Sequence, residues 1–384
     1  MKQNILTSLV NTARTRSVLA EYGPIKPPII IHIPAVPKAH QRLGVDSLVK
    51  FDLKIIQSAL QTKNETWFES EMALKKGPSS LALSMIGIPK SAEFEACNGF
   101  AVSSPIMQVG TDFYLGTSSI LLAIERRIGF QSLFPSPELV KNPSGRYPRF
   151  KEAEFKALQM WTDSSLKSLF IPLENEFVSD SYVKYCLKIV STLLREHSLG
   201  SKSIYHHLLS DSTEENKNMI WTGLYGPSSS IHIADIYVGN VILALMENPN
   251  YKRVILNFPD IIAWLDRMQE FFTTSTVYSF PLDNIKDMER ICTLSYMRNE
   301  YGSPSQRKFE KWNNEGPDVN VILLTGQEFT GNFVAENDWE YSISRQLLFN
   351  DFTINTGKNP LLYGTINFSK SLVDVFDHEA NKGT

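Results

Sequence analysis

Residues 104–120 read SPIMQVGTDFYLGTSSI and determine the fold more than any other part of the chain. They predict a strand that begins with Pro105, a tight turn at Gly110 and Thr111, a second strand and then a helix. Proline is tolerated at the start of a strand, where its missing N–H costs no ladder bond, and glycine readily adopts the positive φ of a hairpin turn. Apolar residues then recur at helical spacing behind residues of N-cap type. The helix is expected to open on three hydroxyl residues, Thr117, Ser118 and Ser119.

This predicted helix start has a chemical consequence. The first N–H groups of a helix have no partner within the helix, and the helix dipole favours a negative charge beside them. The strand that begins at Ser104 and Pro105 is expected to lie next to this helix end. The two features together suit a small peptide that is held by its backbone and by its carboxylate.

The segment resembles the second half of the thioredoxin-like domain of glutathione S-transferases. In that family a cis-proline precedes the third strand, and an acid, Ser or Thr, and then Ile open the helix after the fourth strand. Pro105 matches the proline, Thr117 the hydroxyl residue and Ile120 the isoleucine. Gly116 stands where the family has Asp or Glu, an acid that helps to bind the γ-glutamyl end of glutathione. The resemblance implies a cis bond between Ser104 and Pro105, and the missing acid implies weak glutathione binding.

A second pair of motifs points to the same family. Residues 231–245 are apolar almost all round, as in a buried helix, and Asp235 lies in their first turn. Residues 258–268 read FPDIIAWLDRM. Both segments resemble motifs of the all-helical C-terminal domain of glutathione transferases, although His232 takes the capping position that is usually Ser or Thr. We therefore expect Asp235 and Trp264 to be buried, with Asp235 bonded to N–H groups at a helix start.

The whole chain is predicted to combine an α/β thioredoxin-like N-terminal domain, an all-α glutathione transferase C-terminal domain and a small all-β C-terminal extension. Short strand-like runs in the tail are separated by turn residues at intervals of ~8–12 residues, as in a β-barrel or meander of SH3-like size. They also resemble, faintly, an extension found in fungal glutathione transferase-like proteins. The predicted segments are an N-terminal extension at 1–27, the two domains at 28–132 and 149–300, and the β extension at 316–376.

Composition limits the function classes. The chain has 384 residues, 42% hydrophobic and 21% charged, which is ordinary globular composition for two domains and an appendage. A formal net charge of -3 gives no strong field to attract nucleic acid or an anionic membrane. The sequence contains no run of about 18 apolar residues, so no membrane span is predicted. Scattered thiols predict a reducing compartment and neither a disulfide frame nor a metal site. The three cysteines are Cys97, Cys186 and Cys292.

The N-terminal residues leave the location of the protein open. Lysine, arginine, serine and threonine occur there with no acid before Glu21, which is the composition of a mitochondrial transit peptide. A frayed extension of a cytoplasmic protein is the alternative that we favour.

The resemblance also assigns candidate site residues. In glutathione transferases a hydroxyl or thiol near the start of the first helix donates a hydrogen bond to the glutathione thiolate. Ser47, expected to open the first helix, is the candidate catalytic residue, and a plain N-cap is its alternative role. Ser104 and Pro105 would hold the cysteinyl backbone, and Thr117 and Ser118 the γ-glutamyl carboxylate.

The sequence leaves two hypotheses for the function of this protein, one an enzyme and one a binding protein. One is an enzyme that conjugates glutathione, as co-substrate, to a small electrophile. The other is a non-catalytic binding protein that uses the groove or the β-rich tail to contact a protein partner. The glycine at Gly116 favours the second, whereas Pro105 and Thr117 allow the first. A homodimer is left open, and the sequence does not specify the electrophile or the partner.

Overall fold

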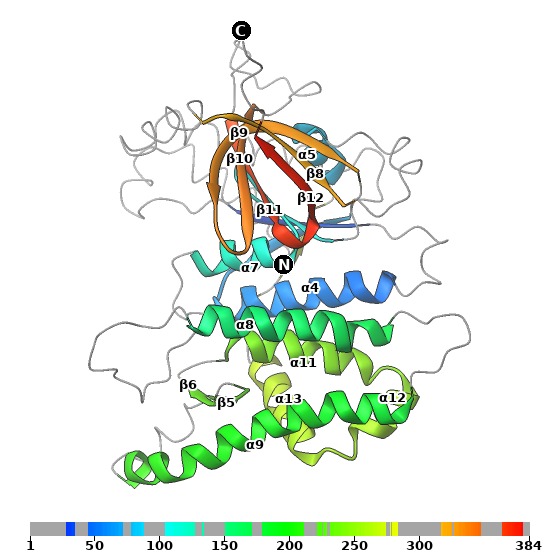
Figure 1. Cartoon of the computed structure of the whole chain (residues 1–384), viewed down its shortest axis with the longest axis vertical. Helices are drawn as coiled ribbons and strands as arrows, with labels where there is room; N and C mark the ends of the chain where they lie inside the picture. The colour runs from blue at the N-terminus through cyan, green and yellow to red at the C-terminus, as the bar shows by residue number, and fades with distance from the viewer. Residues whose placement is uncertain are drawn as a thin grey trace, which may run out of the picture. The chain divides into compact units, whose positions relative to one another are not determined.

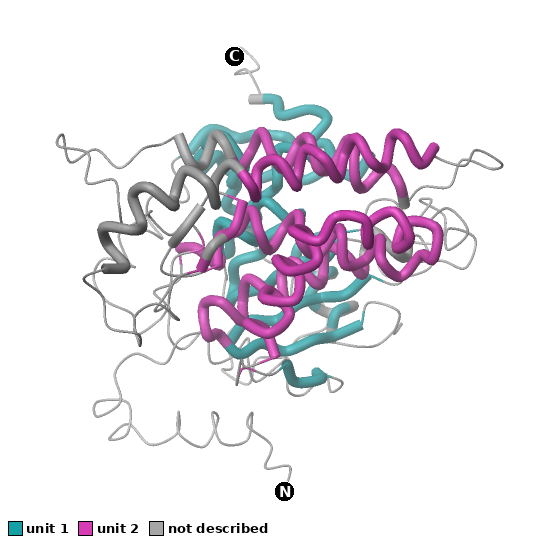
Figure 2. Tube along the Cα trace, turned by 90° about the horizontal axis from the view of Figure 1, so that it is seen from below, with its two compact units in different colours: residues 1–36, 66–123, 278–384 teal, residues 37–65, 124–277 magenta. Residues whose placement is uncertain are grey.

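The structure is a computed structural model of the whole chain (Figure 1). It describes residues 28–34, 45–71, 78–87, 104–126, 133, 150–170, 179–210, 221–224, 226–228, 231–273, 277, 279–282, 316–324, 326–346 and 363–378. The predicted N-terminal extension, residues 1–27, lies outside these residues, and so does the segment with the composition of a transit peptide. Two compact units are distinguished in Figure 2. Unit 1 comprises residues 1–36, 66–123 and 278–384, and unit 2 comprises residues 37–65 and 124–277.

A ten-stranded mixed sheet forms unit 1, with the order β12-β8-β9-β10-β11-β4-β3-β1-β2-β7. Strand β1 is parallel to β2 and antiparallel to β3, and β3 forms a hairpin with β4. This β2-β1-β3-β4 order agrees with the predicted thioredoxin-like domain. The bounds of its strands are Ile29–Ile33, Trp67–Glu71, Ile106–Val109 and Asp112–Leu115 for β1 to β4.

The hairpin and helix expected from residues 104–120 are confirmed. Val109 pairs with Asp112 across the turn, and Gly110 has the predicted positive φ of 64°. Helix α7 (Thr117–Arg126) follows β4 directly, and helix α5 (Pro78–Met85) lies between β2 and β3 in the sequence. This motif could be predicted from the sequence because its turn, its strands and its helix start each depend on residues that are close together in the chain.

The tail forms the predicted strands, but they join the thioredoxin-like sheet. Strands β8 to β11 are an antiparallel meander, and β12 returns past the short 3-10 helix η4 (Lys370–Leu372) to pair with β8. Strand β11 pairs in parallel with β4. The extension therefore continues the sheet instead of standing apart. Its strands are Asp318–Leu323, Glu328–Glu336, Glu340–Gln346, Tyr363–Ser369 and Val373–His378 for β8 to β12.

One hydrophobic core joins the extension to the thioredoxin-like strands. Phe113 of β4 and Ile366 and Phe368 of β11 belong to the same buried cluster as Ile30 of β1. Phe329 of β9 packs edge-on against Phe368, with 5.0 Å between ring centroids. Burying apolar side chains is the main favourable contribution to folding, so this shared core explains why the extension docks on the sheet.

The other edge of the sheet departs from the prediction. Strand β7 (Ser279–Pro281) pairs in parallel with β2, although it lies within the segment expected to be all-helical. A two-stranded hairpin, β5 (Trp221–Gly223) and β6 (Gly226–Ser228), also interrupts the helices of that segment. Short strands of three residues carry too little periodicity to be recognised in a sequence.

Unit 2 is otherwise helical. Helix α4, expected in the thioredoxin-like domain, groups with this unit because its buried face, which includes Phe51 and Ile55, contacts α11. Helix α11 is buried along almost its whole length, as predicted. None of the described helices has the length and apolar character needed to cross a bilayer. The helices are α4 (Val45–Thr62), α8 (Phe150–Trp161), the π-helix η2 (Thr162–Leu166), the 3-10 helix η3 (Lys167–Phe170), α9 (Asp180–Ser210), α11 (Ile233–Leu245), α12 (Pro249–Ile255) and α13 (Pro259–Thr273).

Candidate functional site

The start of helix α7 is the centre of the candidate site. The carbonyl of Gly116 accepts a hydrogen bond from the Ile120 N–H at 3.1 Å, which places Gly116 at the N-cap. Its φ is +89°, a backbone conformation that residues with a Cβ adopt only with strain. A Cβ at this position would lie 2.5 Å from the Ser369 hydroxyl oxygen. An acid at position 116 therefore does not fit this arrangement.

The extension supplies the side-chain cap that Gly116 lacks. Ser369, the last residue of β11, accepts a hydrogen bond from the Ser119 N–H at 2.9 Å. An N-cap side chain makes this same bond to the third residue of a helix. Ser369 is separated from Ser119 by 250 residues in the sequence, so the cap is a tertiary contact.

A buried carboxylate lies at the same helix end. The Ser119 hydroxyl donates to Glu340 Oε2 at 2.8 Å and also lies 3.3 Å from the Asn367 carbonyl oxygen. The other oxygen of Glu340 accepts from Asn337 Nδ2 at 3.2 Å. Only 1% of Glu340 is exposed. A helix N-terminus is a favourable place for such a carboxylate, because the dipole and the hydrogen bonds offset part of the cost of burial.

Four predicted site residues belong to unit 1. Thr117 and Ser118 are the first two residues of α7, and Pro105 directly precedes β3. Among the described residues no peptide bond is cis, so Ser104–Pro105 is trans. The expected cis bond was wrong. The cis and trans forms of a peptide bond before proline differ in free energy by only about 0.5–1 kcal/mol. The tertiary surroundings therefore decide the isomer, and a proline at the matching position of the sequence does not predict it.

Ser47 is placed differently from the prediction. Helix α4 begins at Val45, so Ser47 is its third residue and lies inside the helix instead of opening it. Ser47 belongs to unit 2, whereas Ser104, Pro105 and Thr117 belong to unit 1. The four substrate-binding candidates thus belong to one unit, and the candidate catalytic residue Ser47 belongs to the other.

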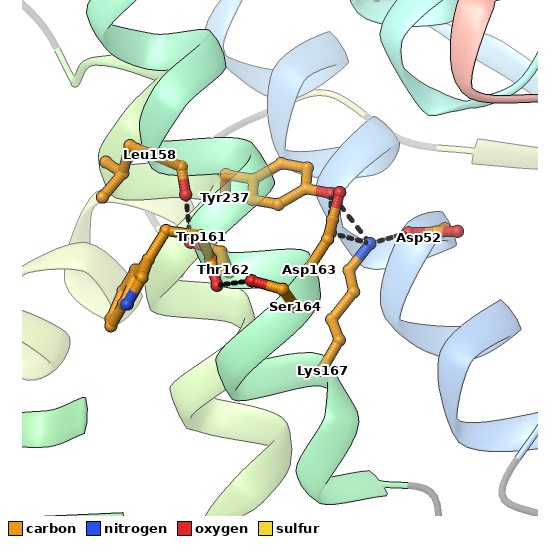
Figure 3. A network of polar contacts seen from close by, with 8 residues as sticks. All are labelled: Asp52, Leu158, Trp161, Thr162, Asp163, Ser164, Lys167 and Tyr237. Carbon is orange, nitrogen blue, oxygen red and sulfur yellow. Dashed lines mark hydrogen bonds and ion pairs between the residues drawn. The ribbon is translucent and has the colours of Figure 1, made fainter. Parts of the chain in front are cut away.

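Unit 2 contains a second polar cluster, shown in Figure 3. The Lys167 ammonium lies 3.0 Å from Asp52 Oδ1 and 2.9 Å from Asp163 Oδ1, and it donates to the Tyr237 hydroxyl at 2.8 Å. The Tyr237 hydroxyl donates in turn to Asp163 at 2.6 Å. The cluster ties α4, η2, η3 and α11 together. Its one sign in the sequence is the spacing of Asp163 and Lys167, four residues apart on one helical face.

The charge states of this cluster argue for a structural role. Burial lowers the pKa of Lys167, but the charge of Asp52 and the other neighbours outweigh it, so the pKa lies above its usual value. Burial raises the pKa of Tyr237, and the Lys167 charge offsets only part of that rise. The ammonium also lies 4.7 Å from the ring centroid of Phe51. A protonated lysine is not a nucleophile. We therefore interpret the cluster of Asp52, Asp163, Lys167 and Tyr237 as a structural contact between helices, and call it the clasp.

The predicted helical-domain motif is confirmed. Asp235 is fully buried and so is Trp264. His232 caps α11 through its ring nitrogen, which accepts from the Ala234 N–H at 3.0 Å. Burial raises the pKa of Asp235 to about 6, against the opposing effect of its hydrogen bonds. The donors to its carboxylate are the Leu224 N–H, Trp221 Nε1, Trp264 Nε1 and the His232 N–H, at 2.8, 3.0, 3.0 and 3.3 Å.

A buried histidine forms a further polar group in unit 1. The two ring nitrogens of His32 lie 3.0 Å from Ser79 Oγ and 3.0 Å from Gln108 Oε1. Ser79 also donates to Ser70 Oγ at 2.8 Å. A serine beside a histidine resembles a nucleophile and its base. All four side chains are buried, however, so the group holds α5 on the sheet and has no access to a substrate.

Within the described residues no group of three or more His, Cys, Asp or Glu side chains could hold a metal ion. Cys186, the cysteine that the structure describes, is buried and free.

Comparison with known proteins supports the fold. No family model matches the sequence, and no curated protein matches it. The solved structure of a GST-like protein from Pseudomonas syringae aligns with a TM-score of 0.51 at 14% identity, covering 92% of this chain and 99% of that chain. A Tau class glutathione S-transferase from mango, Mangifera indica, aligns with a TM-score of 0.36 at 13% identity, covering 71% of this chain and 99% of that chain. The first similarity shows that the fold is GST-like and shows nothing of activity, and the second is too low to add to it.

Proposed function

We propose that this chain is a non-catalytic binding protein with a glutathione transferase fold. The observation that carries the proposal is the first turn of α7, where Ser369 and Glu340 are hydrogen-bonded to Ser119. By the resemblance, this turn is where a transferase would bind the γ-glutamyl carboxylate of glutathione. Here the chain's own extension already takes the donors of Ser119, the third residue of this turn, beside the candidate carboxylate-binding residues Thr117 and Ser118.

Two further observations support this proposal. Gly116 has neither the side chain nor the room for the acid that the resemblance requires. The trans bond at Ser104–Pro105 does not present the backbone of Ser104 in the way that a cis bond would. Each change weakens a different part of a glutathione site.

Weak glutathione binding, with conjugation to a small electrophile, is the second candidate. It would use Ser104 and Pro105 for the cysteinyl backbone, Thr117 and Ser118 for the carboxylate, and Ser47 for the sulfur. The observation in its favour is that Thr117 and Ser118 do occupy the first two positions of α7, with Ser118 partly exposed.

The binding protein would engage a protein partner through its C-terminal β region. Leu324 and Val375 of this region are exposed apolar side chains, which is the observation behind that choice. A cytoplasmic location fits the buried free thiol of Cys186, and a mitochondrial location is the alternative. A second copy of this chain is the alternative protein partner, in which case the protein would form a homodimer.

Calorimetry and an activity assay test the two candidates. We expect the purified full-length protein to show no saturable heat with glutathione at millimolar concentration, and no conjugation of a generic electrophile above the uncatalysed rate. Saturable binding together with conjugation that falls in the Ser47→Ala variant would contradict the proposal and establish the second candidate, because the hydroxyl would then act on the thiolate.

A further inference from the structure

We infer that strand β12 pairs along its outer edge with an extended, basic segment of a partner protein, which adds a further strand to the sheet. The inference rests on the proposed function and names the chemistry of the partner. Strand β12 ends the sheet, and in the described part of the chain no strand pairs with its outer edge. Alternate residues of an antiparallel strand bond to its neighbour, so the remaining N–H and C=O groups of β12 face away from β8. Such an edge is a template for another strand.

The edge of β12 is regular and held in place. From Val375 to His378 its register with β8 is uninterrupted, and the irregularity in this pairing lies before Val375. On the side of the hydrophobic core, the Phe376 ring stacks on the Tyr341 ring with 4.2 Å between their centroids. A strand that is already fixed loses little conformational freedom when a second strand pairs with it. Strand β12 also contains neither Pro nor Lys, two residues that commonly protect a sheet edge from pairing.

The outer face of the sheet beside this edge carries apolar side chains. Every second residue of β8 from Val319 to Leu323 is buried, so the residues between them face away from the core. Val375 of β12 pairs with Ile322 on that outer face. Val375 is 41% exposed, and Leu324, directly after β8, is 65% exposed. An added strand with an apolar side chain opposite Val375 would shield it from water.

The charge of these strands selects a basic partner. Strands β8, β9 and β12 contain five Asp or Glu residues and no Lys or Arg, and one of the five, Glu336, is paired with Lys370. Asp374 and Asp377 of β12 are exposed, and Asp377 lies two residues from Val375 on the same face. Opposite charges directly across two strands stabilise their pairing, and like charges destabilise it. A second copy of β12 would bring the same acids together, whereas a strand with Lys or Arg two positions from an apolar residue matches Asp377 and Val375.

Fluorescence anisotropy of labelled synthetic peptides tests the inference on the full chain. The peptide VTKTVTKT, when extended, places valine and lysine alternately on one face, and VTETVTET is its acidic counterpart. We expect the basic peptide to bind the wild type saturably and to bind Asp377→Lys about tenfold more weakly, because an attraction across the strands becomes a repulsion. The acidic peptide should show the reverse preference. Asp266→Lys, at an exposed position of α13 in unit 2, is the matched control, since it changes the net charge equally and should leave binding unchanged.

Hydrogen exchange followed by mass spectrometry locates the bound peptide. Amides of β12 should gain protection on binding, because the added strand takes up its outer N–H groups. Binding without protection of β12 overturns the inference, and so does equal binding of the basic peptide by the wild type and Asp377→Lys. If Asp377→Lys does not fold, Asp377→Asn, which removes the charge and nearly keeps the volume, is measured in the same way.

Further outcomes separate this inference from the proposed function. A wild type that sediments as a dimer and becomes a monomer in Val375→Lys would show that a second copy occupies the edge, and this also overturns the inference. Failure of the basic peptide to bind overturns the inference and leaves the proposed function intact. Conjugation of glutathione that depends on Ser47 overturns the proposed function, whether or not β12 binds the peptide.

Discussion

At the residue scale, Gly116 shows how the backbone and the neighbours of one position restrict the residue that can stand there. Its identity in the sequence is a departure from the transferase pattern, and the structure gives the cause. The residue has φ +89° and lies against Ser369, which fills the space of its missing side chain. The same residue that removes the acid therefore admits the extension.

Gly116→Asp should destabilise the protein and should not create glutathione binding. The positive φ costs about 1–2 kcal/mol for a residue with a Cβ, and displacement of the Ser369 side chain adds to it. Urea unfolding measures the loss. Gly326→Asp is the control, since Gly326 has φ +79° with no atom within 4 Å of its added Cβ. Equal losses at the two positions would mean that Ser369 does not occupy the space beside Gly116.

His32 should make the stability of unit 1 depend on pH. Burial lowers its pKa from 6.5 to about 4, against the hydrogen bond to Gln108. Between these values the unfolded chain binds more protons than the folded one, so stability falls as pH drops from 6.5 toward 4, by up to about 3 kcal/mol. Urea unfolding at pH 7 and pH 5 should show this slope. The His32→Gln variant should lose the part of the slope that His32 contributes, and an unchanged slope would refute the assignment.

At the element scale, local signals were readable and long-range pairings were not. The hairpin and helix of residues 104–120 and the capped helix at Asp235 follow from turn residues, caps and helical spacing within a few positions. The β4–β11 pairing joins residues whose contact depends on the whole chain, so no local pattern could reveal it. The same holds for the Ser369 cap, because its partner Ser119 lies 250 residues away.

The clasp at Lys167 should stabilise the helical unit. Lys167→Met would leave the partly buried Asp52 without its cation, and we expect a loss of about 2–3 kcal/mol, below that of a fully buried pair because Asp163 is partly exposed. Thermal or urea unfolding measures it. Lys54→Met is the matched control on α4, the helix that carries Asp52, because the Lys54–Glu247 pair is exposed and contributes little to stability. Similar effects of the two variants would show that the clasp contributes nothing special.

At the scale of the whole molecule, the extension is part of the same sheet and core as the thioredoxin-like strands. Its strands continue the thioredoxin-like sheet, share its hydrophobic core and cap its last helix. A further contact runs from Arg345 of β10 to the carbonyl of Ile86, just after α5, at 3.2 Å. A segment that is built into the sheet in this way covers the first turn of α7 as part of folding, through the contacts of Ser369 and Glu340 with Ser119.

Phe368→Ala tests whether unit 1 is one cooperative body. Phe368 is fully buried in the shared core and contacts Phe329, so its truncation should cost about 3–5 kcal/mol. Hydrogen exchange followed by mass spectrometry should then show amides of the extension and amides of β3, β4 and α7 losing protection together, because partners in one core open as one unit. Val375→Ala, at an exposed position of β12, should change stability by less than about 0.5 kcal/mol. Opening of the extension alone, with β3, β4 and α7 still protected, would show that it is a separable module and that α7 can be uncovered without unfolding the sheet beneath it.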